Sequence, residues 1–197
     1  MGPDIAAALT RCWWADAGAS DALMTQYHDC EWGVPIDDDL ELFERLALES
    51  FQAGLSWRTI LAKRDAFRRA FAGFDPTVVA GFGEADVARL MADAGIVRNR
   101  AKVEATIGNA RAFLALQREA GSFAGYLDRF VPPPPPRLPR DAAGSGAIPV
   151  TTPAAEALSR DLRARGFRFV GPTIVYAFLQ SVGQVDDHLP GCFRYRG

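Results

Sequence analysis

The two histidines and three cysteines of this 197-residue chain are the side chains best suited to metal chemistry. His188 and Cys192 stand four positions apart in the segment VDDHLPGC, on either side of a Leu-Pro-Gly turn. An imidazole nitrogen and a thiolate at this spacing can face one metal ion, although a hydrogen-bonded histidine beside a buried cysteine is the commoner arrangement. This pair alone leaves both interpretations open.

A second histidine and cysteine lie near the N-terminus. Cys12 occurs in RCWWAD and His28 in QYHDCEWG, so the chain has one histidine and one cysteine toward each end. A tetrahedral Cys2His2 site built from both pairs would tie the two ends together and stabilise a small helical protein. Cys30 lies two residues after His28 and stays open as a further candidate ligand.

The composition indicates one compact protein in a reducing compartment. Hydrophobic residues make up 49% of the chain, but no run of about 18 apolar residues could span a membrane. The first ten residues lack the basic and apolar segments of a signal peptide, and three cysteines are too few for a disulfide scaffold. We therefore expect a cytoplasmic protein. Because the net charge is −2, any nucleic-acid contact must come from a local basic patch.

The elements that would position these residues are helices, because helical periodicity covers most of the chain. In residues 37–55, aspartates suited to a helix N-terminus precede Leu40, Phe43 and Leu46, which share one apolar face. Further helices are expected at residues 59–74, 75–95 (two short ones), 97–121, 152–166 and 172–183. A group of basic side chains is expected around the first half of the 97–121 helix: Arg98, Arg100, Lys102 and Arg111.

One domain is expected to include nearly the whole chain, at residues 11–197, after a flexible N-terminal extension at residues 1–10. Five consecutive prolines and a Gly/Ser-rich tract fall within about residues 132–149, where neither a helix nor a strand ladder is favoured. We interpret this segment as a surface loop, because the roughly 50 residues that follow are few for an independent core.

The last two predicted helices are joined by a tight turn, GFRFVG, which is typical of a helix-hairpin-helix motif. Gly166 and Gly171 flank the turn, and Thr173 lies in the first turn of the second helix. Glycines permit a close backbone approach, and the free N–H groups of a helix N-terminus favour a phosphate without recognising any base. Two helices joined through glycines are also common where they bind nothing, so the motif alone does not distinguish a DNA-binding hairpin from an ordinary helix pair.

Motifs along nearly the whole chain resemble those of the type I DNA-3-methyladenine glycosylases, the Tag family. RCWWAD, YHDCEWGVP, LFERLALESFQAGLSWRTIL, DAGIVRNRAKVEATIGNARAF, RGFRFVGPTIVYAFLQSVG and DHLPGC follow in that family's order. The resemblance implies an all-α, helix-hairpin-helix glycosylase fold in which a structural Zn²⁺ site joins the N- and C-terminal segments. It also leaves Cys30 outside the site. The implied zinc ligands are Cys12, His28, His188 and Cys192.

The activity implied by the resemblance is base-excision repair: monofunctional hydrolysis of the N-glycosidic bond of 3-methyladenine in alkylated DNA. The expected partner is double-stranded DNA carrying alkylated bases, and a monomer is expected. A flipped base needs a pocket, and aromatic rings attract a cationic methylated base more strongly than a neutral one. The Gly54-Leu55 turn is implied as the wedge that fills the gap in the duplex. The implied base-binding residues are Trp14, Tyr27, Trp32, Glu49 and Trp57.

Two carboxylates are candidates for catalytic roles. Glu49 lies in an apolar helix, where an unpaired carboxylate is destabilising unless a ligand, an arginine or a helix N-terminus satisfies it. Asp186 occupies the position of a catalytic aspartate in the wider helix-hairpin-helix glycosylase superfamily, whereas the Tag family often has asparagine there. Asp186 is therefore predicted either to orient water or stabilise the sugar cation, or to cap the turn and support His188.

Two other functions are alternatives to the glycosylase. A zinc hydrolase needs an open coordination position, which a Cys2His2 set does not leave. A non-catalytic, zinc-stabilised helix-hairpin-helix module that binds DNA remains the alternative. Release of free 3-methyladenine from methylated DNA would distinguish the enzyme from this module.

Overall fold

Helices make up the regular structure of the computed structural model, which describes residues 9–15 and 21–196. The described residues contain no strand, only an isolated bridge between Arg137 and Asp186. Residues 1–8 of the predicted N-terminal extension lie outside the described residues. In chain order the elements are α1 (Ala22–Cys30), α2 (Asp39–Gln52), α3 (Trp57–Ala70), η3 (Ala72–Phe74), α4 (Pro76–Val79), α5 (Glu84–Ala92), α6 (Arg100–Ala120), α7 (Phe123–Leu127), η4 (Ser145–Ala147), α8 (Pro153–Ala164) and α9 (Pro172–Ser181).

The helices begin where the sequence supplies a capping side chain. Asp38 accepts a hydrogen bond from the Glu41 N–H at 2.9 Å, and Ser56 and Asn99 cap α3 and α6 in the same way. Pro153 and Pro172 open α8 and α9 at positions where a missing N–H has no consequence. These six predicted helical regions are confirmed, whereas α1 and the short α7 were not predicted. Only Tyr27 and His28 are buried in α1, so it has no apolar stripe from which to predict it.

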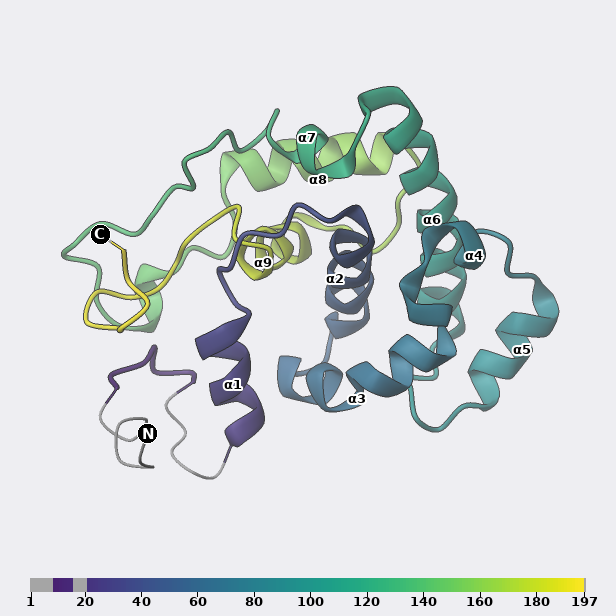
Figure 1. Ribbon diagram of the computed structural model, residues 1–197, viewed down its shortest axis with the longest axis horizontal. Helices are drawn as coiled ribbons and strands as arrows, with labels where there is room; N and C mark the ends of the chain where they lie inside the picture. The colour runs from purple at the N-terminus through teal and green to yellow at the C-terminus, as the bar shows by residue number, and fades with distance from the viewer. Residues whose placement is uncertain (1–8, 16–20, 197) are drawn as a thin grey trace.

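Helix α2 lies in the middle of the molecule and contacts α3, α6, α7 and α9 (Figure 1). Its apolar face is part of a core of phenylalanines, in which Phe51 packs 4.6 Å from Phe67 and Phe43 packs 5.1 Å from Phe113, measured between ring centroids. Helices α4, α5 and α6 lie at one end of the molecule, and α8 packs along α9.

Two predicted side-chain positions are wrong. Leu40 is 45% exposed, because the first turn of α2 directs the adjacent Asp39, and not Leu40, toward the N–H groups at the start of α7. Lys102 was expected on a basic surface but is buried, since α6 presents it to the end of α2, where backbone carbonyls accept its hydrogen bonds. In both cases, the burial of the side chain depends on how a second element packs against the helix, which the periodicity of one helix does not predict.

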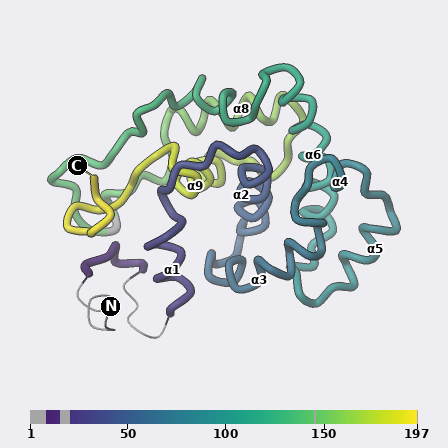
Figure 2. Tube along the Cα trace, viewed as in Figure 1, coloured from purple at the N-terminus to yellow at the C-terminus, as the bar shows by residue number. Residues whose placement is uncertain are grey.

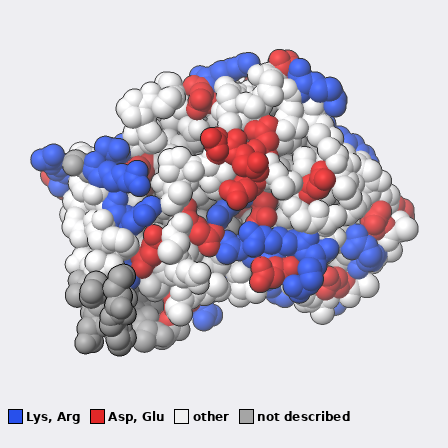
Figure 3. All heavy atoms as spheres, in the orientation of Figure 1, with Lys and Arg blue, Asp and Glu red and all other residues white. Residues whose placement is uncertain are grey.

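Segments from the two ends of the chain lie side by side at the end of the molecule opposite α5 (Figure 2). The Phe193 N–H donates a hydrogen bond to the Thr10 carbonyl at 2.9 Å, which joins residues 9–15 to the C-terminal segment. The face seen in Figure 3 carries basic and acidic side chains next to one another, so neither positive nor negative charge dominates it. No helix among the described residues is both long and apolar enough to cross a membrane.

A candidate metal centre beside an aromatic pocket

Four buried side chains from the two ends of the chain converge on one point: Cys12, His28, His188 and Cys192. One nitrogen or sulfur atom from each lies within 4.8 Å of all the others. The Cys192 sulfur is 3.4 Å from His28 Nε2 and 3.7 Å from His188 Nδ1. The predicted four-residue cluster is therefore confirmed as an arrangement that could hold a metal, and Cys30 is exposed and lies outside it.

Three of the distances between donor atoms match the edges of a tetrahedral metal site. Metal–sulfur and metal–nitrogen bonds of about 2.0–2.3 Å place the corners of a tetrahedron about 3.3–3.8 Å apart. The Cys12 sulfur lies 3.8 Å from His188 Nδ1, within the same range as the two contacts of Cys192. Hydrogen bonding to Cys12 lowers the pKa of the Cys192 thiol, and the same contact raises the pKa of the Cys12 thiol.

Neighbouring groups fix the orientation of both imidazole rings. His28 Nδ1 lies 2.8 Å from the Asp29 carboxylate, and Asp29 in turn accepts hydrogen bonds from Arg11. His188 Nε2 lies 3.3 Å from the Trp32 carbonyl. Because each ring is held through its outer nitrogen, the other nitrogen is left free to bind a metal.

A pocket of about 280 Å³ lies next to this cluster. Its volume is close to the lower end of the range for small-molecule sites, about 300 Å³. All five residues predicted to bind a base line it, and they come from residues 9–15, α1, α2, α3 and the segment after α1. Among the described residues, the pocket is lined by Trp14, Met24, Tyr27, Trp32, Glu49, Gln52, Trp57, Ile148, Ala177 and Gln180.

The aromatic walls of the pocket pack against one another and against the metal cluster. Trp14 meets Trp32 edge-on at 5.0 Å between ring centroids, and Tyr27 lies 5.2 Å from Trp57. Trp14 also packs 5.2 Å from the His28 ring. The position of the Trp14 and Trp32 walls therefore depends on the residues that could hold the metal.

Glu49 is the acidic group of the pocket. Its side chain is 3% exposed, and its Oε2 has no hydrogen-bond partner among the described residues. Burial raises the pKa of this carboxyl to about 8, although the nearby Arg45 guanidinium lowers it. The indole N–H of Trp57 is likewise buried without a partner. A buried acceptor and a buried donor that line the same cavity are the polar groups expected of a site awaiting a ligand.

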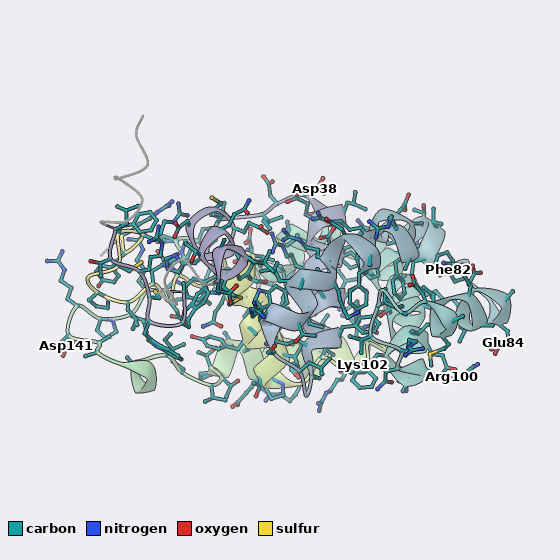
Figure 4. All side chains as sticks on the ribbon, turned by 90° about the horizontal axis from the view of Figure 1, so that it is seen from below. Asp38, Phe82, Glu84, Arg100, Lys102 and Asp141 are labelled. Carbon is teal, nitrogen blue, oxygen red and sulfur yellow. The ribbon has the colours of Figure 1, made fainter. Side chains whose placement is uncertain are left out.

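The turn between α2 and α3 presents an exposed leucine beside the pocket. Gly54 has a φ of +80°, which a residue with a side chain rarely adopts, and Leu55 is 41% exposed. Lys102, labelled near the middle of the molecule in Figure 4, reaches this turn from α6. Its ammonium donates hydrogen bonds to the carbonyls of Phe51 at 2.8 Å and Ala53 at 2.6 Å. The Gly54-Leu55 turn is thus fixed to α6 by a buried charge.

The predicted hairpin joins α8 and α9. Gly166 has a φ of +92°, and Gly171 caps α9 just before Pro172 and Thr173. Asn109 of α6 makes two hydrogen bonds to the hairpin, accepting from the Arg168 N–H at 2.8 Å and donating to its carbonyl at 3.0 Å. Helix α6 therefore holds both the hairpin and the Gly54-Leu55 turn.

A family model for methyladenine glycosylases matches residues 14–195, nearly the whole chain. The chain belongs to the methyladenine glycosylase family. It is 47% identical over 189 residues to DNA-3-methyladenine glycosylase 1 of Escherichia coli (strain K12), with 96% of this chain and 98% of that protein covered. The likeness extends over the full length of both proteins.

Solved structures show the same likeness. The crystal structure of a 3-methyladenine DNA glycosylase I (TAG) has a TM-score of 0.89 at 47% identity, covering 94% of this chain and all of that chain. A tyrosine-to-phenylalanine variant of a 3-methyladenine DNA glycosylase I, solved in complex with 3-methyladenine, has a TM-score of 0.85 at 39% identity and covers 89% of this chain and 94% of that chain. The predicted all-α fold of this glycosylase family is confirmed.

Asp186 does not line the pocket of this methyladenine glycosylase family member. Its backbone N–H donates to the Pro136 carbonyl at 3.0 Å, and its carboxylate lies 3.6 Å from the Arg137 guanidinium. The same carboxylate accepts a hydrogen bond from the His188 N–H at 3.4 Å. These contacts are those of a residue that caps the turn and supports a metal ligand, and a catalytic role for Asp186 stays a prediction.

Several residues of the glycosylase-family pocket were missed. Gln52 follows Glu49 by three positions on α2, a spacing that places both on one helix face and could have been used to find it. Ile148 belongs to the proline-rich segment, which was interpreted as a surface loop but supplies part of the pocket wall. Met24, Ala177 and Gln180 could not be predicted, because the sequence around them does not distinguish a residue that lines a pocket from one that is buried in the core.

Proposed function

We propose that this protein is a monofunctional DNA glycosylase that hydrolyses the N-glycosidic bond of 3-methyladenine in alkylated double-stranded DNA. The observation that carries the proposal is the buried, unpartnered carboxylate of Glu49 in a pocket walled by aromatic rings. The lesion is a cationic nucleotide, which both an aromatic face and a carboxylate attract. The 3-methyladenine activity of the relatives supports this choice of base.

The chemistry requires little acid catalysis, because 3-methyladenine leaves a cationic nucleotide as a neutral base. Binding the flipped base between Trp14, Tyr27 and Trp57 orients the glycosidic bond, and the charge of Glu49 favours the positively charged state. Glu49 is mostly protonated in the empty pocket at neutral pH because its pKa is about 8. The positive charge of the lesion lowers that pKa, so binding of the lesion ionises Glu49, and the carboxylate then stabilises the positive charge in the pocket.

A monofunctional mechanism also agrees with the lysines. Lys63 and Lys102 are the only two in the chain. Both ammonium groups donate to backbone carbonyls, Lys63 to Ala94 and Gly95 and Lys102 to Phe51 and Ala53. Neither lines the pocket. A Schiff base with the sugar therefore has no lysine nearby to form it.

The proposed contacts with DNA come from two turns. Leu55 enters the gap that the flipped nucleotide leaves, while Gly54 keeps the turn narrow. The N–H groups at the start of α9, between Gly171 and Thr173, bind a backbone phosphate. One chain supplies the pocket, the wedge and the hairpin, so we expect a monomer to be active.

We infer that the metal of the four-residue cluster is Zn²⁺ and that its role is structural. Two thiolates and two imidazoles are typical zinc ligands, and four of them fill a tetrahedron without an open position for water. The metal would hold residues 9–15 and α1 to the C-terminal segment and thereby support the Trp14 and Trp32 walls.

The experiment that tests the proposed function is direct. Purified protein, in excess over the methylated bases, is incubated with N-methylated duplex DNA. Free 3-methyladenine is then measured by chromatography and mass spectrometry. We expect release in a single turnover with no strand cleavage. Binding of the methylated duplex without release of any base would instead favour the non-catalytic helix-hairpin-helix module.

The role of Asp186 is tested by Asp186→Asn. The asparagine side-chain oxygen can still accept the His188 N–H, and the residue lies outside the pocket, so we expect the single-turnover excision rate to stay within about threefold of wild type. A fall of a hundredfold or more with unchanged thermal stability would assign Asp186 a catalytic role.

The role of Lys102 is tested by Lys102→Met, which keeps the length of the side chain and removes both hydrogen bonds to the turn. We expect excision from duplex DNA to fall by about tenfold or more, because charge-assisted hydrogen bonds of about 1.5–3 kcal/mol no longer fix the wedge. Binding of free 3-methyladenine, measured by quenching of tryptophan fluorescence, should change little. Lys63→Met is the matched control, since it also frees two carbonyls but leaves the Gly54-Leu55 turn intact. Equal losses in both variants would contradict the assignment.

A further inference from the structure

Gln180 of α9 lines the pocket but contributes no aromatic surface and no charge. Its side-chain amide nitrogen, Nε2, donates a hydrogen bond to Oδ2 of Asp187 at 2.6 Å. Asp187 is 3% exposed, so this contact is well shielded from solvent. Gln180 is therefore a pocket residue whose side chain is held from behind.

The contact with Asp187 fixes which end of the amide faces the carboxylate. Oδ2 of Asp187 also accepts a hydrogen bond from the Tyr176 hydroxyl at 2.5 Å. Oδ2 of Asp187 acts only as an acceptor, so the Gln180 amide must face it with its nitrogen and not with its oxygen. This orientation is the same whether or not the other oxygen of Asp187 carries a proton. The amide oxygen of Gln180, Oε1, must then point the other way.

Oε1 is an acceptor without a donor. Among the described residues, none donates a hydrogen bond to it, and the side chain borders the same cavity as Glu49. Glu49 lies on α2 and Gln180 on α9, two helices that contact each other. The pocket thus holds two acceptors that come from different helices.

We propose that Gln180 is a specificity-determining residue whose Oε1 accepts a hydrogen bond from the exocyclic amino group of the flipped base. This inference rests on the proposed glycosylase function. A 6-amino purine has two N–H bonds at this edge, one for each acceptor, whereas a 6-oxo purine presents an oxygen lone pair to them. A site built to receive N–H groups rejects an analogue that lacks them, since its buried acceptors are left unpaired. Asp187 is the positioning residue that keeps Oε1 aimed at the base.

The test compares release of 3-methyladenine and 3-methylguanine from duplex DNA by wild type and Gln180→Met under single-turnover conditions. Methionine keeps the length of the side chain and removes the acceptor. We expect the ratio of the two rates to fall by about tenfold or more, mainly through slower release of 3-methyladenine. An unchanged ratio would overturn the proposal, even if both rates fell together.

Two further variants separate specificity from folding. Asp187→Asn offers both an acceptor and a donor to Gln180, so its amide can take either orientation, and the ratio should fall in the same direction by a smaller factor. Tyr176→Phe removes the other donor to Asp187, but Asp187 can still accept from Gln180 Nε2 and Tyr176 does not line the pocket, so the ratio should stay within about threefold of wild type. A large change of the ratio in Tyr176→Phe would contradict the assignment to Gln180. If wild type released neither base, the proposed function itself would fail, which is a different result from an unaltered ratio.

Discussion

Glu49→Gln is expected to lower the single-turnover rate of 3-methyladenine excision by about a hundredfold or more. The glutamine keeps the size and an acceptor oxygen but cannot become an anion opposite the cationic lesion, and removal of one such electrostatic contact typically costs a factor of 10²–10³. At protein concentrations too low to saturate the DNA, where the rate reports the free protein, excision by the wild type should rise with pH toward about 8, where Glu49 ionises in the empty pocket. The variant should lose this dependence. Excision assays from pH 5.5 to 9 measure both effects.

The same substitution is expected to stabilise the protein at alkaline pH. Glu49 has a folded-state pKa of about 8 against an ordinary value of 4.5, so the folded protein binds the extra proton between these two pH values. The free energy of unfolding must then fall as the pH rises through this window, by a total on the order of 4 kcal/mol. Glutamine does not titrate, so Glu49→Gln should be close to wild type at pH 5 and more stable at pH 8.5.

Urea unfolding at the two pH values checks this stability prediction. Glu44→Gln is the matched control, because Glu44 lies on the same helix and its carboxylate is paired with Arg68 at 2.8 Å outside the pocket. This control should retain excision and should not gain stability at pH 8.5. A Glu49→Gln variant that is no more stable than wild type at pH 8.5 would show that Glu49 is not a buried, unpartnered acid.

Removal of the metal is the second change with a large expected effect. Structural zinc contributes on the order of 10 kcal/mol in small zinc-dependent domains, and here it would join residues 9–15 and α1 to the C-terminal segment. We expect a strong chelator, or Cys192→Ala, to lower the melting temperature by about 10 °C or more and to abolish excision. Excision is lost because His28 and His188 support the aromatic walls of the pocket.

Elemental analysis and calorimetry test this prediction together. Wild type should contain about one zinc per chain, and Cys192→Ala well under one. Cys30→Ala is the matched control: Cys30 is exposed and outside the cluster, so the metal content, melting temperature and excision rate should all stay unchanged. A well-folded, active wild type without metal would contradict the structural site.

The sequence predicted those parts of the fold that have a local cause. Caps such as Asp38 and Asn99 mark where helices begin, and the spacing of Phe43 and Leu46 identifies the buried face of α2. The four metal-site residues could be found because histidine and cysteine are rare in this chain. One histidine and one cysteine toward each end suggested a single site, and the family resemblance left Cys30 outside it, as the structure does.

The remaining features depend on contacts that a residue makes outside its own helix or segment. Lys102 looks like one of several surface cations, and only the position of the α2 carbonyls explains why it is buried. Ile148 lies in a proline-rich segment, and its place in the pocket depends on how that segment crosses the surface. Gln180 has no distinctive local pattern, since its orientation is decided by Asp187, which lies beyond the end of α9. Local propensity carries no information about such contacts.

Lys102 and Asn109 stand seven residues apart on α6, about 10 Å along the helix axis. In the proposed complex, α6 would therefore set the separation between Leu55, which enters the duplex, and the hairpin, which binds the backbone. Because one helix fixes this separation, the DNA would bend to meet both contacts. Damaged base steps unstack at a lower energetic cost than intact ones. The deformability of the DNA at each site would then be tested before a base enters the pocket. Methylated sites, which deform more easily, would have longer dwell times than undamaged DNA.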